Sequence, residues 1–301
     1  MKILFLSSGG NTCDYQRDAL FHGLRTLLGS GVVDVHRIDT MYKDFGDVSG
    51  LYGRGMTLYG LLGDDSDVDR TDIPRKIANK YFDIVLYGSV HRCQDYLQEV
   101  ASMYDPRRVI FIDGEDHAGY LQGLGGIYLK RELYNAQPNV WPIHFAIPAE
   151  KILSDAPIKS RLMAPCDPLN RKTYIYKTEQ EYYAQYADSY YAPTMKKAGW
   201  EALRHEEILS QWCLPYFRVM DQLPNLICHK LPRLELMLVK SMVEYWADTK
   251  NGNIRDLLID LWAAIIDRVM KVVREELTTV ALAKYVLNIV GVKELCPVLT
   301  L

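Results

Sequence analysis

Four short segments of the chain carry side chains that could move a proton or bind an anion. The densest is Asp113–His117, where three carboxylates and an imidazole directly follow an apolar run. Crowded acids raise one another's pKa, which prepares a carboxyl group for proton transfer. His91 also follows an apolar run, and an imidazole can act as a general base near neutral pH. The candidate catalytic residues are therefore His91, Asp113 and Asp116, with a surface histidine and a solvated acidic loop as the alternative interpretations.

Two further segments could bind phosphate. Gly9 and Gly10 end the first apolar run within Ser7–Asn11, and small residues before a helix let the backbone approach an anion. No GxGxxG pattern is present, so a dinucleotide site is not indicated. The second segment, Lys196–Glu207, combines two lysines, a glycine turn and a predicted helix with Arg204 and Glu207 on one face. The alternatives are a plain turn and an intrahelical salt bridge.

Metal binding is not expected from the sequence. Asp64–Asp69 contains an Asp-Xaa-Asp pattern that can hold Mg²⁺ against a diphosphate, but acids are also favoured before a helix start. The six cysteines are scattered without a CxxC pair. This spacing predicts reduced thiols in a cytoplasmic protein, and neither a disulfide framework nor a zinc site.

Alternating extended and helical patterns predict the elements that would position these residues. In the first half we expect strands over 2–7, 32–38, 83–88 and 108–112, and helices over 14–28, 72–80 and 95–103. This alternation predicts an α/β fold with a parallel, doubly wound sheet. Ligands of such sheets bind beyond the carboxyl ends of the strands, where the candidate residues fall. The Gly- and Asp-rich segment 44–69 predicts a long irregular loop near the site.

The second half begins as a smaller α/β unit and ends as helices. Residues 135–150 hold three prolines and no clear period, which predicts a boundary between domains at 1–140 and 141–301. We expect strands near 174–176, 190–196 and 214–219, helices over 178–189 and 201–212, and a helical tail from about 233. Asn251-Gly252 separates two tail helices, and a last helix covers 278–290. The tail is interpreted as a cap on the second domain; the alternative, a membrane-surface helix, lacks the usual basic bias.

Composition sets the broad class. The chain has 301 residues, 49% of them hydrophobic and 24% charged, as in a globular protein of two domains. A net charge of −3 argues against a protein that coats DNA. The longest apolar runs fall far short of the roughly 20 residues that span a bilayer, and Ile3–Leu6 is too short for a signal peptide. We therefore expect a cytoplasmic protein with no transmembrane segment.

The stretch Gly199–Phe217 resembles the C-terminal signature of the CgeB-like group of GT-B glycosyltransferases, related to glycosyltransferase family 1. That signature has an Arg, a Glu three residues later and a short apolar strand, which Arg204, Glu207 and Leu214–Phe217 match. Lys130-Arg131-Glu132 and Pro142–Pro148 also resemble the family's inter-domain region. Trp212 departs from the pattern, because the family usually has a small residue there, and the chain is short for this fold.

The resemblance implies two Rossmann-like domains facing a cleft. Glu207 would bind hydroxyl groups of a nucleotide-diphosphate sugar, and Arg204 and Lys196 would bind its phosphates. The nucleotide-contacting set implied by the segments above is Gly9, Gly10, Lys130, Arg131, Lys196, Arg204 and Glu207.

The activity implied is transfer of a sugar to a hydroxyl acceptor, without a metal or another cofactor. An inverting enzyme would need a base, for which His91, Asp113 and Asp116 are candidates. A glycan, glycolipid or protein acceptor is left open; a hydroxymethylated base in phage DNA is disfavoured by the net charge. The alternative is a GT-B-like binding or scaffold protein without catalysis, as Trp212 and the short second half suggest.

Overall fold

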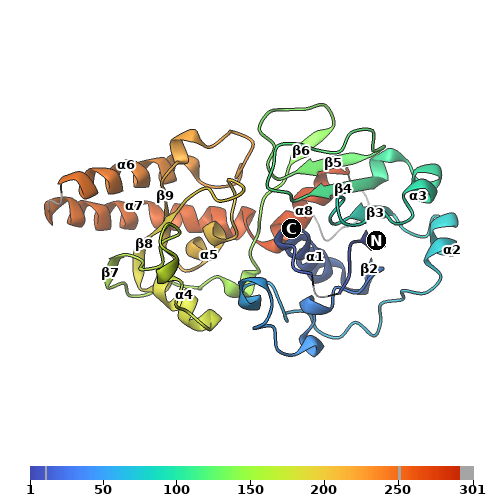
Figure 1. The fold of residues 1–301 in the computed structure, drawn as a ribbon, viewed down its shortest axis with the longest axis horizontal. Coiled ribbons are helices and arrows are strands. Elements are labelled where there is room, and N and C mark those ends of the chain that lie inside the picture. The colour runs from blue at the N-terminus through green and yellow to red at the C-terminus, as the bar shows by residue number, and fades with distance from the viewer. Residues whose placement is uncertain (11, 250–251, 292–301) are drawn as a thin grey trace.

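The computed structural model describes residues 1–10, 12–249 and 252–291. Its first sheet has six parallel strands in the order β2-β1-β3-β4-β5-β6 (Figure 1). The strands are β1 (Ile3–Leu6), β2 (Val32–Asp34), β3 (Ile84–Tyr87), β4 (Val109–Asp113), β5 (Ile127–Lys130) and β6 (Val140–Pro142). The expected α/β class with a Rossmann-like parallel sheet is thereby confirmed.

Strand residues of the first sheet alternate between two apolar cores. Ile3 and Phe5 of β1 pack in the core that includes α1 (Tyr15–Leu28) and α8 (Thr279–Ile289). Leu4 and Leu6 pack in the core that includes α2 (Ile73–Ala78) and α3 (Leu97–Met103). Both faces are therefore buried, which explains why these strands read as unbroken apolar runs.

A second, three-stranded parallel sheet lies beside the first. Its order is β7-β8-β9, formed by Arg161–Met163, Ser189–Thr194 and Leu214–Phe217. The shorter helices of this part are α4 (Glu179–Ala187) and α5 (Arg204–Ser210); the long ones are α6 (Arg233–Thr249) and α7 (Gly252–Glu276). Buried residues of α6 and α7 share one core with Leu214 and Phe217 of β9. The apolar stripe of α7 thus packs against protein, as the cap interpretation expected.

The last helix does not cap the second sheet. Helix α8 crosses back to the first sheet and lies against α1, as the red and blue ribbons show (Figure 1). Gly23 makes this approach possible, because a Cβ there would lie 1.8 Å from the carbonyl oxygen of Thr279.

Strand β6 also crosses the expected boundary at 140. Residues beyond that boundary therefore complete the first unit. Asn251, expected between the tail helices, lies outside the described residues.

Several short elements differ from the expectation. The strand expected near 174–176 is wrong, since those residues form no strand and follow a 3-10 turn. Strands β5, β6 and β7 were not expected, because none of them lies in a long apolar run like those that mark β1, β3 and β4. Helix α5 begins at Arg204 and not at 201.

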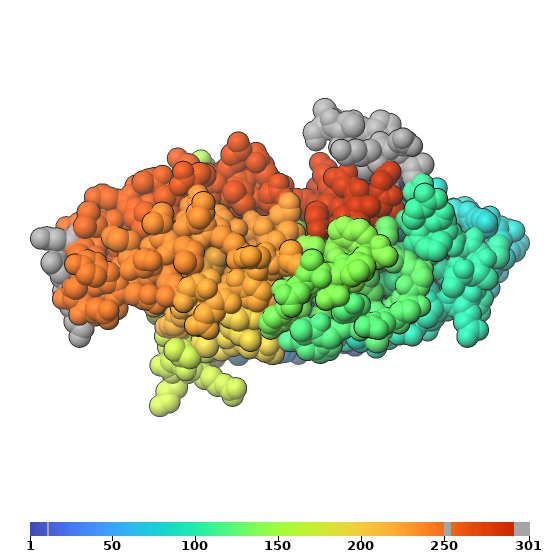
Figure 2. Space-filling view, turned by 90° about the horizontal axis from the view of Figure 1, so that it is seen from above, coloured from blue at the N-terminus to red at the C-terminus, as the bar shows by residue number. Residues whose placement is uncertain are grey.

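The molecule is elongated (Figure 2), with the green and cyan segments of the first sheet at one end and the orange α6 and red-orange α7 at the other. Within the described ranges, none of the helices is both long and apolar enough to cross a membrane.

Candidate functional site

One cavity of about 840 Å³ is lined by residues that follow strands of both sheets. From the first unit come Tyr15 after β1, Tyr52–Arg54 and Met56 after β2, and Asp116 after β4. From the second come Cys166 after β7, and Met195, Lys197–Gly199 and Glu201–Leu203 after β8. This is the edge at which parallel sheets bind ligands, and the volume suits a small organic molecule.

The cavity has four cationic side chains, which come from three segments of the chain. They are Arg54, Arg171, Lys197 and Arg204. Among the described residues, none of the four makes an ion pair with a carboxylate. Lys197 Nζ donates to the carbonyl of Pro168 at 2.6 Å, and the Arg204 guanidinium lies 4.9 Å from the ring centroid of Tyr174. Cationic side chains without an ion-paired carboxylate in a concave site attract an anionic ligand.

Aromatic rings form another part of the cavity wall. Five tyrosines line the cavity: Tyr15, Tyr52, Tyr174, Tyr176 and Tyr182. Tyr15 and Tyr52 form one pair with ring centroids 5.8 Å apart, and Tyr176 and Tyr182 form another at 6.3 Å. Such rings can stack on a planar base or a sugar face and offer hydroxyl groups for hydrogen bonds.

Glu207 joins the two units at the cavity wall. Its carboxylate accepts hydrogen bonds from the Thr57 hydroxyl at 2.6 Å and the Tyr182 hydroxyl at 2.9 Å. Burial raises the pKa of Glu207 above its ordinary value, and these hydrogen bonds offset only part of that rise. Thr57 has a φ of 77°, an unfavourable conformation for a β-branched residue. Its N–H also donates to Glu179 at 2.7 Å, so the strained loop is held against α4 and α5.

His91 and Asp113 are brought together, but neither lines the cavity. The buried Asp113 carboxylate accepts hydrogen bonds from Lys130 Nζ at 2.8 Å, Tyr128 Oη at 2.6 Å and His91 Nε2 at 3.0 Å. Burial raises the pKa of Asp113, but the three hydrogen bonds outweigh burial and hold it below its ordinary value. Asp113 is thus an ionised partner that can orient His91 at a place outside the cavity wall.

Asp116 is the one candidate acid of the 113–117 loop on the cavity wall. Its side chain is 53% exposed and is ion-paired with the buried guanidinium of Arg131. Arg131 also donates to the carbonyl of Glu201 at 3.1 Å, while Glu132 accepts from the N–H of Trp200 at 2.9 Å. Arg131 and Glu132 therefore fix the turn at 199–201 from behind the wall.

The remaining expected ligands lie elsewhere. Lys130 and Arg131 are buried at the end of β5 and do not line the cavity. Gly9 packs under His36, and the N–H of Gly10 donates a hydrogen bond to the backbone carbonyl of Arg37 at 3.1 Å. Asn11 lies outside the described residues.

Lys196 lies on the other side of the chain from the cavity. Its Nζ is 4.6 Å from the ring of Trp200. The chain alternates after β8, so Met195 and Lys197 line the cavity instead.

The structure also places Trp212, the acidic segment 64–69 and the cysteines that were singled out in the sequence. Trp212 does not line the cavity; it packs in the second core with a φ of 57° and donates its indole N–H to Leu153 at 2.9 Å. Asp65 of the acidic segment is paired with Arg37 and Arg70. The five described cysteines are free thiols, and Cys296 lies outside the described residues.

Sequence reasoning missed Arg54, Thr57, Arg171 and Tyr182. Arg54 and Thr57 belong to the segment expected to be an irregular loop near the site, but no period marks which of its residues face inward. The frequency of tyrosine, 21 in the chain, was the only available signal for the aromatic wall.

Comparisons with family models, curated proteins and solved structures gave no match to this chain. The chemistry of the site is therefore inferred from its geometry.

A pH dependence follows from Glu201, which lines the cavity. Burial raises the pKa of Glu201 to about 8, and the Arg131 charge lowers it only in part. The folded protein then holds a proton that the unfolded chain releases above its ordinary pKa of 4.5. Stability is expected to fall as pH rises from about 5 to about 8. Urea unfolding across this range should show the slope, and Glu201→Gln should reduce it; an equal slope in both proteins would contradict the assignment.

Proposed function

We propose that this protein is a glycosyltransferase of the GT-B kind, which transfers a sugar from a nucleotide-diphosphate sugar to a hydroxyl acceptor. One observation carries the proposal: four cations, none of them ion-paired with a carboxylate of the described residues, line a cavity at the carboxyl ends of two parallel sheets. A diphosphate is the ligand that best matches this charge. The resemblance of Gly199–Phe217 to the family signature supports it independently, since Arg204 and Glu207 of that signature both line the cavity.

The donor would be held by three kinds of contact. Arg171, Lys197 and Arg204 would neutralise the diphosphate, with bidentate hydrogen bonds from the guanidinium groups. The tyrosine rings would stack on the base or the sugar. Glu207 would accept hydrogen bonds from hydroxyl groups of the nucleotide sugar. These would replace its present hydrogen bonds from Thr57 and Tyr182.

The same groups would favour the transition state. As the bond between the sugar carbon and the diphosphate oxygen breaks, negative charge grows on the leaving group beside the cations. In an inverting reaction the acceptor oxygen bonds to the sugar carbon as its proton passes to a base. Asp116 is proposed as that base, because it lines the cavity and Arg131 fixes its position.

A binding protein without catalysis is the second candidate. It is favoured by Glu207, whose two carboxylate oxygens are already engaged by Thr57 and Tyr182. Slow hydrolysis of a bound nucleotide sugar would exclude this candidate.

The experiment that tests the donor site compares two neighbouring lysines. Lys197→Ala removes a cavity cation, whereas Lys196→Ala removes one that lies over Trp200. Loss of a charge-assisted hydrogen bond should weaken binding of UDP, GDP or ADP about ten- to hundredfold in Lys197→Ala. Calorimetry should find Lys196→Ala close to the parent protein. Equal affinities for the two variants would show that the diphosphate does not lie here.

A further inference from the structure

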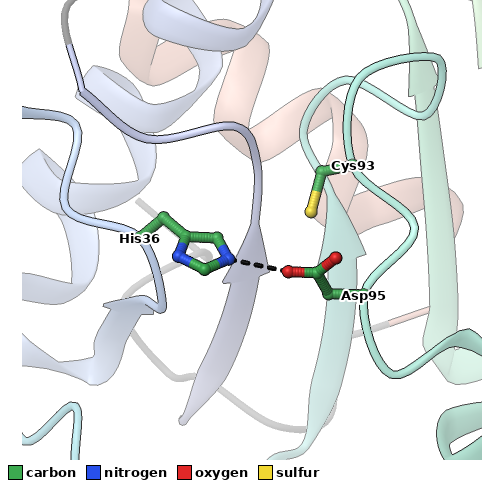
Figure 3. Close-up of side chains that lie close together, drawn as sticks. All are labelled: His36, Cys93 and Asp95. Atoms are coloured by element: carbon green, nitrogen blue, oxygen red, sulfur yellow. Dashed lines mark hydrogen bonds and ion pairs between the residues drawn. The ribbon is translucent and has the colours of Figure 1, made fainter.

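A second cluster of chemically active side chains lies apart from the cavity. It consists of His36, Cys93 and Asp95, one ligand atom from each lying within 4.8 Å of the others (Figure 3). None of the three lines the cavity. We propose that they form a binding site for a zinc ion.

The fold brings the three residues together from two loops. His36 follows β2, whereas Cys93 and Asp95 follow β3, and these strands flank β1 in the first sheet. Gly9, after β1, lies under His36, where a Cβ would come within 2.6 Å of the histidine Cβ. The site thus lies at the carboxyl edge of the sheet, where β2, β1 and β3 all end.

The donor atoms match zinc more closely than magnesium or calcium. A thiolate and an imidazole are preferred by Zn²⁺, and a carboxylate is an accepted third ligand. The ligands of a tetrahedral zinc ion, at bond lengths of about 2.0–2.3 Å, lie roughly 3.3–3.8 Å apart. His36 Nε2 and Asp95 Oδ2 are now 2.7 Å apart as a hydrogen-bonded pair, so small side-chain rotations suffice.

Burial and charge favour entry of a cation from solvent. Cys93 is 6% exposed, whereas the side chains of His36 and Asp95 are 46% and 51% exposed. The ion would therefore have protein on the thiol side and a water molecule in the fourth position.

The neighbouring guanidinium groups are occupied elsewhere. Arg37 is paired with three carboxylates, those of Asp39, Asp44 and Asp65. Arg92 is paired with Asp14 and Glu115. Within the described part of the chain, His36 is the only side chain that pairs with Asp95, so no cation of the protein competes for that carboxylate.

The backbone around the ligands is already fixed. The N–H of Cys93 donates to Ser89 at 3.0 Å, and the Tyr87 hydroxyl donates to the carbonyl of Asp95 at 3.1 Å. A bound ion would tie the loop after β2 to the loop after β3 and stabilise the first unit by mass action. The scattered cysteines gave no sign of such a site, because only one of them takes part.

The test is metal binding by the untagged, chelator-stripped protein. Zn²⁺ titration in competition with a chromophoric chelator should find one ion per chain, and bound Co²⁺ should show thiolate-to-cobalt charge-transfer absorption. Cys93→Ser should remove that absorption, and His36→Ala should weaken binding roughly tenfold or more. His36 is exposed, so its variant should fold, which circular dichroism checks.

The matched controls are Cys13→Ser and His117→Ala, a thiol and an imidazole outside the cluster. Both should bind zinc as the parent protein does. No stoichiometric binding, or binding that survives in both Cys93→Ser and His36→Ala, would overturn the proposal. These readouts do not depend on any glycosyltransferase activity.

Discussion

Arg204→Ala is expected to lower kcat/KM for the nucleotide sugar by about 10²–10³-fold, the usual cost of removing one preorganised charge from a transition state. Arg204 lines the cavity three residues before Glu207, and it has no carboxylate partner within the described chain. Its charge is therefore available to a leaving diphosphate. Steady-state transfer or donor hydrolysis is the measurement.

Two controls separate a role in the reaction from a role in folding. Arg204→Lys keeps the charge but loses the planar fork, so an intermediate activity is expected. Arg107→Ala removes an 85% exposed guanidinium from the first unit and should leave activity unchanged. Full turnover by Arg204→Ala, with folding intact, would contradict the donor assignment.

Lys130→Met is expected to destabilise the fold by about 3–5 kcal/mol, because it leaves the Asp113 carboxylate buried without its cation. Both side chains are fully buried and their charged atoms are 2.8 Å apart. Urea unfolding measures the loss, and adding Asp113→Asn to the variant should recover part of it.

The control for this loss is an ion pair nearer the surface. Lys151 Nζ lies 2.7 Å from Glu179, but both side chains are partly exposed. Lys151→Met should cost no more than about 1 kcal/mol. If Lys130→Met cost as little, Asp113 would not depend on Lys130, and its lowered pKa would need another explanation.

The fold could be predicted from the sequence where apolar runs were long. The runs at 83–88 and 108–112 predicted β3 and β4, because a strand buried on both faces is apolar throughout. β5 could not be found this way, since Ile127–Lys130 holds only three consecutive apolar residues. The return of α8 to α1 depends on Gly23, and contacts so distant in sequence leave no local pattern.

The candidate site could be predicted in part, because ligands of parallel sheets bind where strands end and helices begin. Strand ends and a helix turn marked Asp116, Arg204 and Glu207, all of which line the cavity. Lys196 was expected at the position in the cavity wall that Lys197 occupies. Side chains after β8 point alternately toward the cavity and away from it, so an error of one residue exchanges the two lysines. Arg54 and Arg171 lie in irregular segments, where only the folded chain decides which residues face inward.

Calorimetry with thermal shift decides whether the cavity binds the diphosphate of a nucleotide sugar. The panel comprises UDP-, GDP-, ADP-, dTDP- and CMP-sugars, the last carrying only one phosphate, on the parent protein and on Arg204→Ala. At least one diphosphate sugar should bind once per chain and raise Tm, CMP-sugars should bind more weakly, and Arg204→Ala should abolish the effect. No binding at roughly millimolar concentration, or equal binding by Arg204→Ala, would show that the cavity is not a diphosphate site.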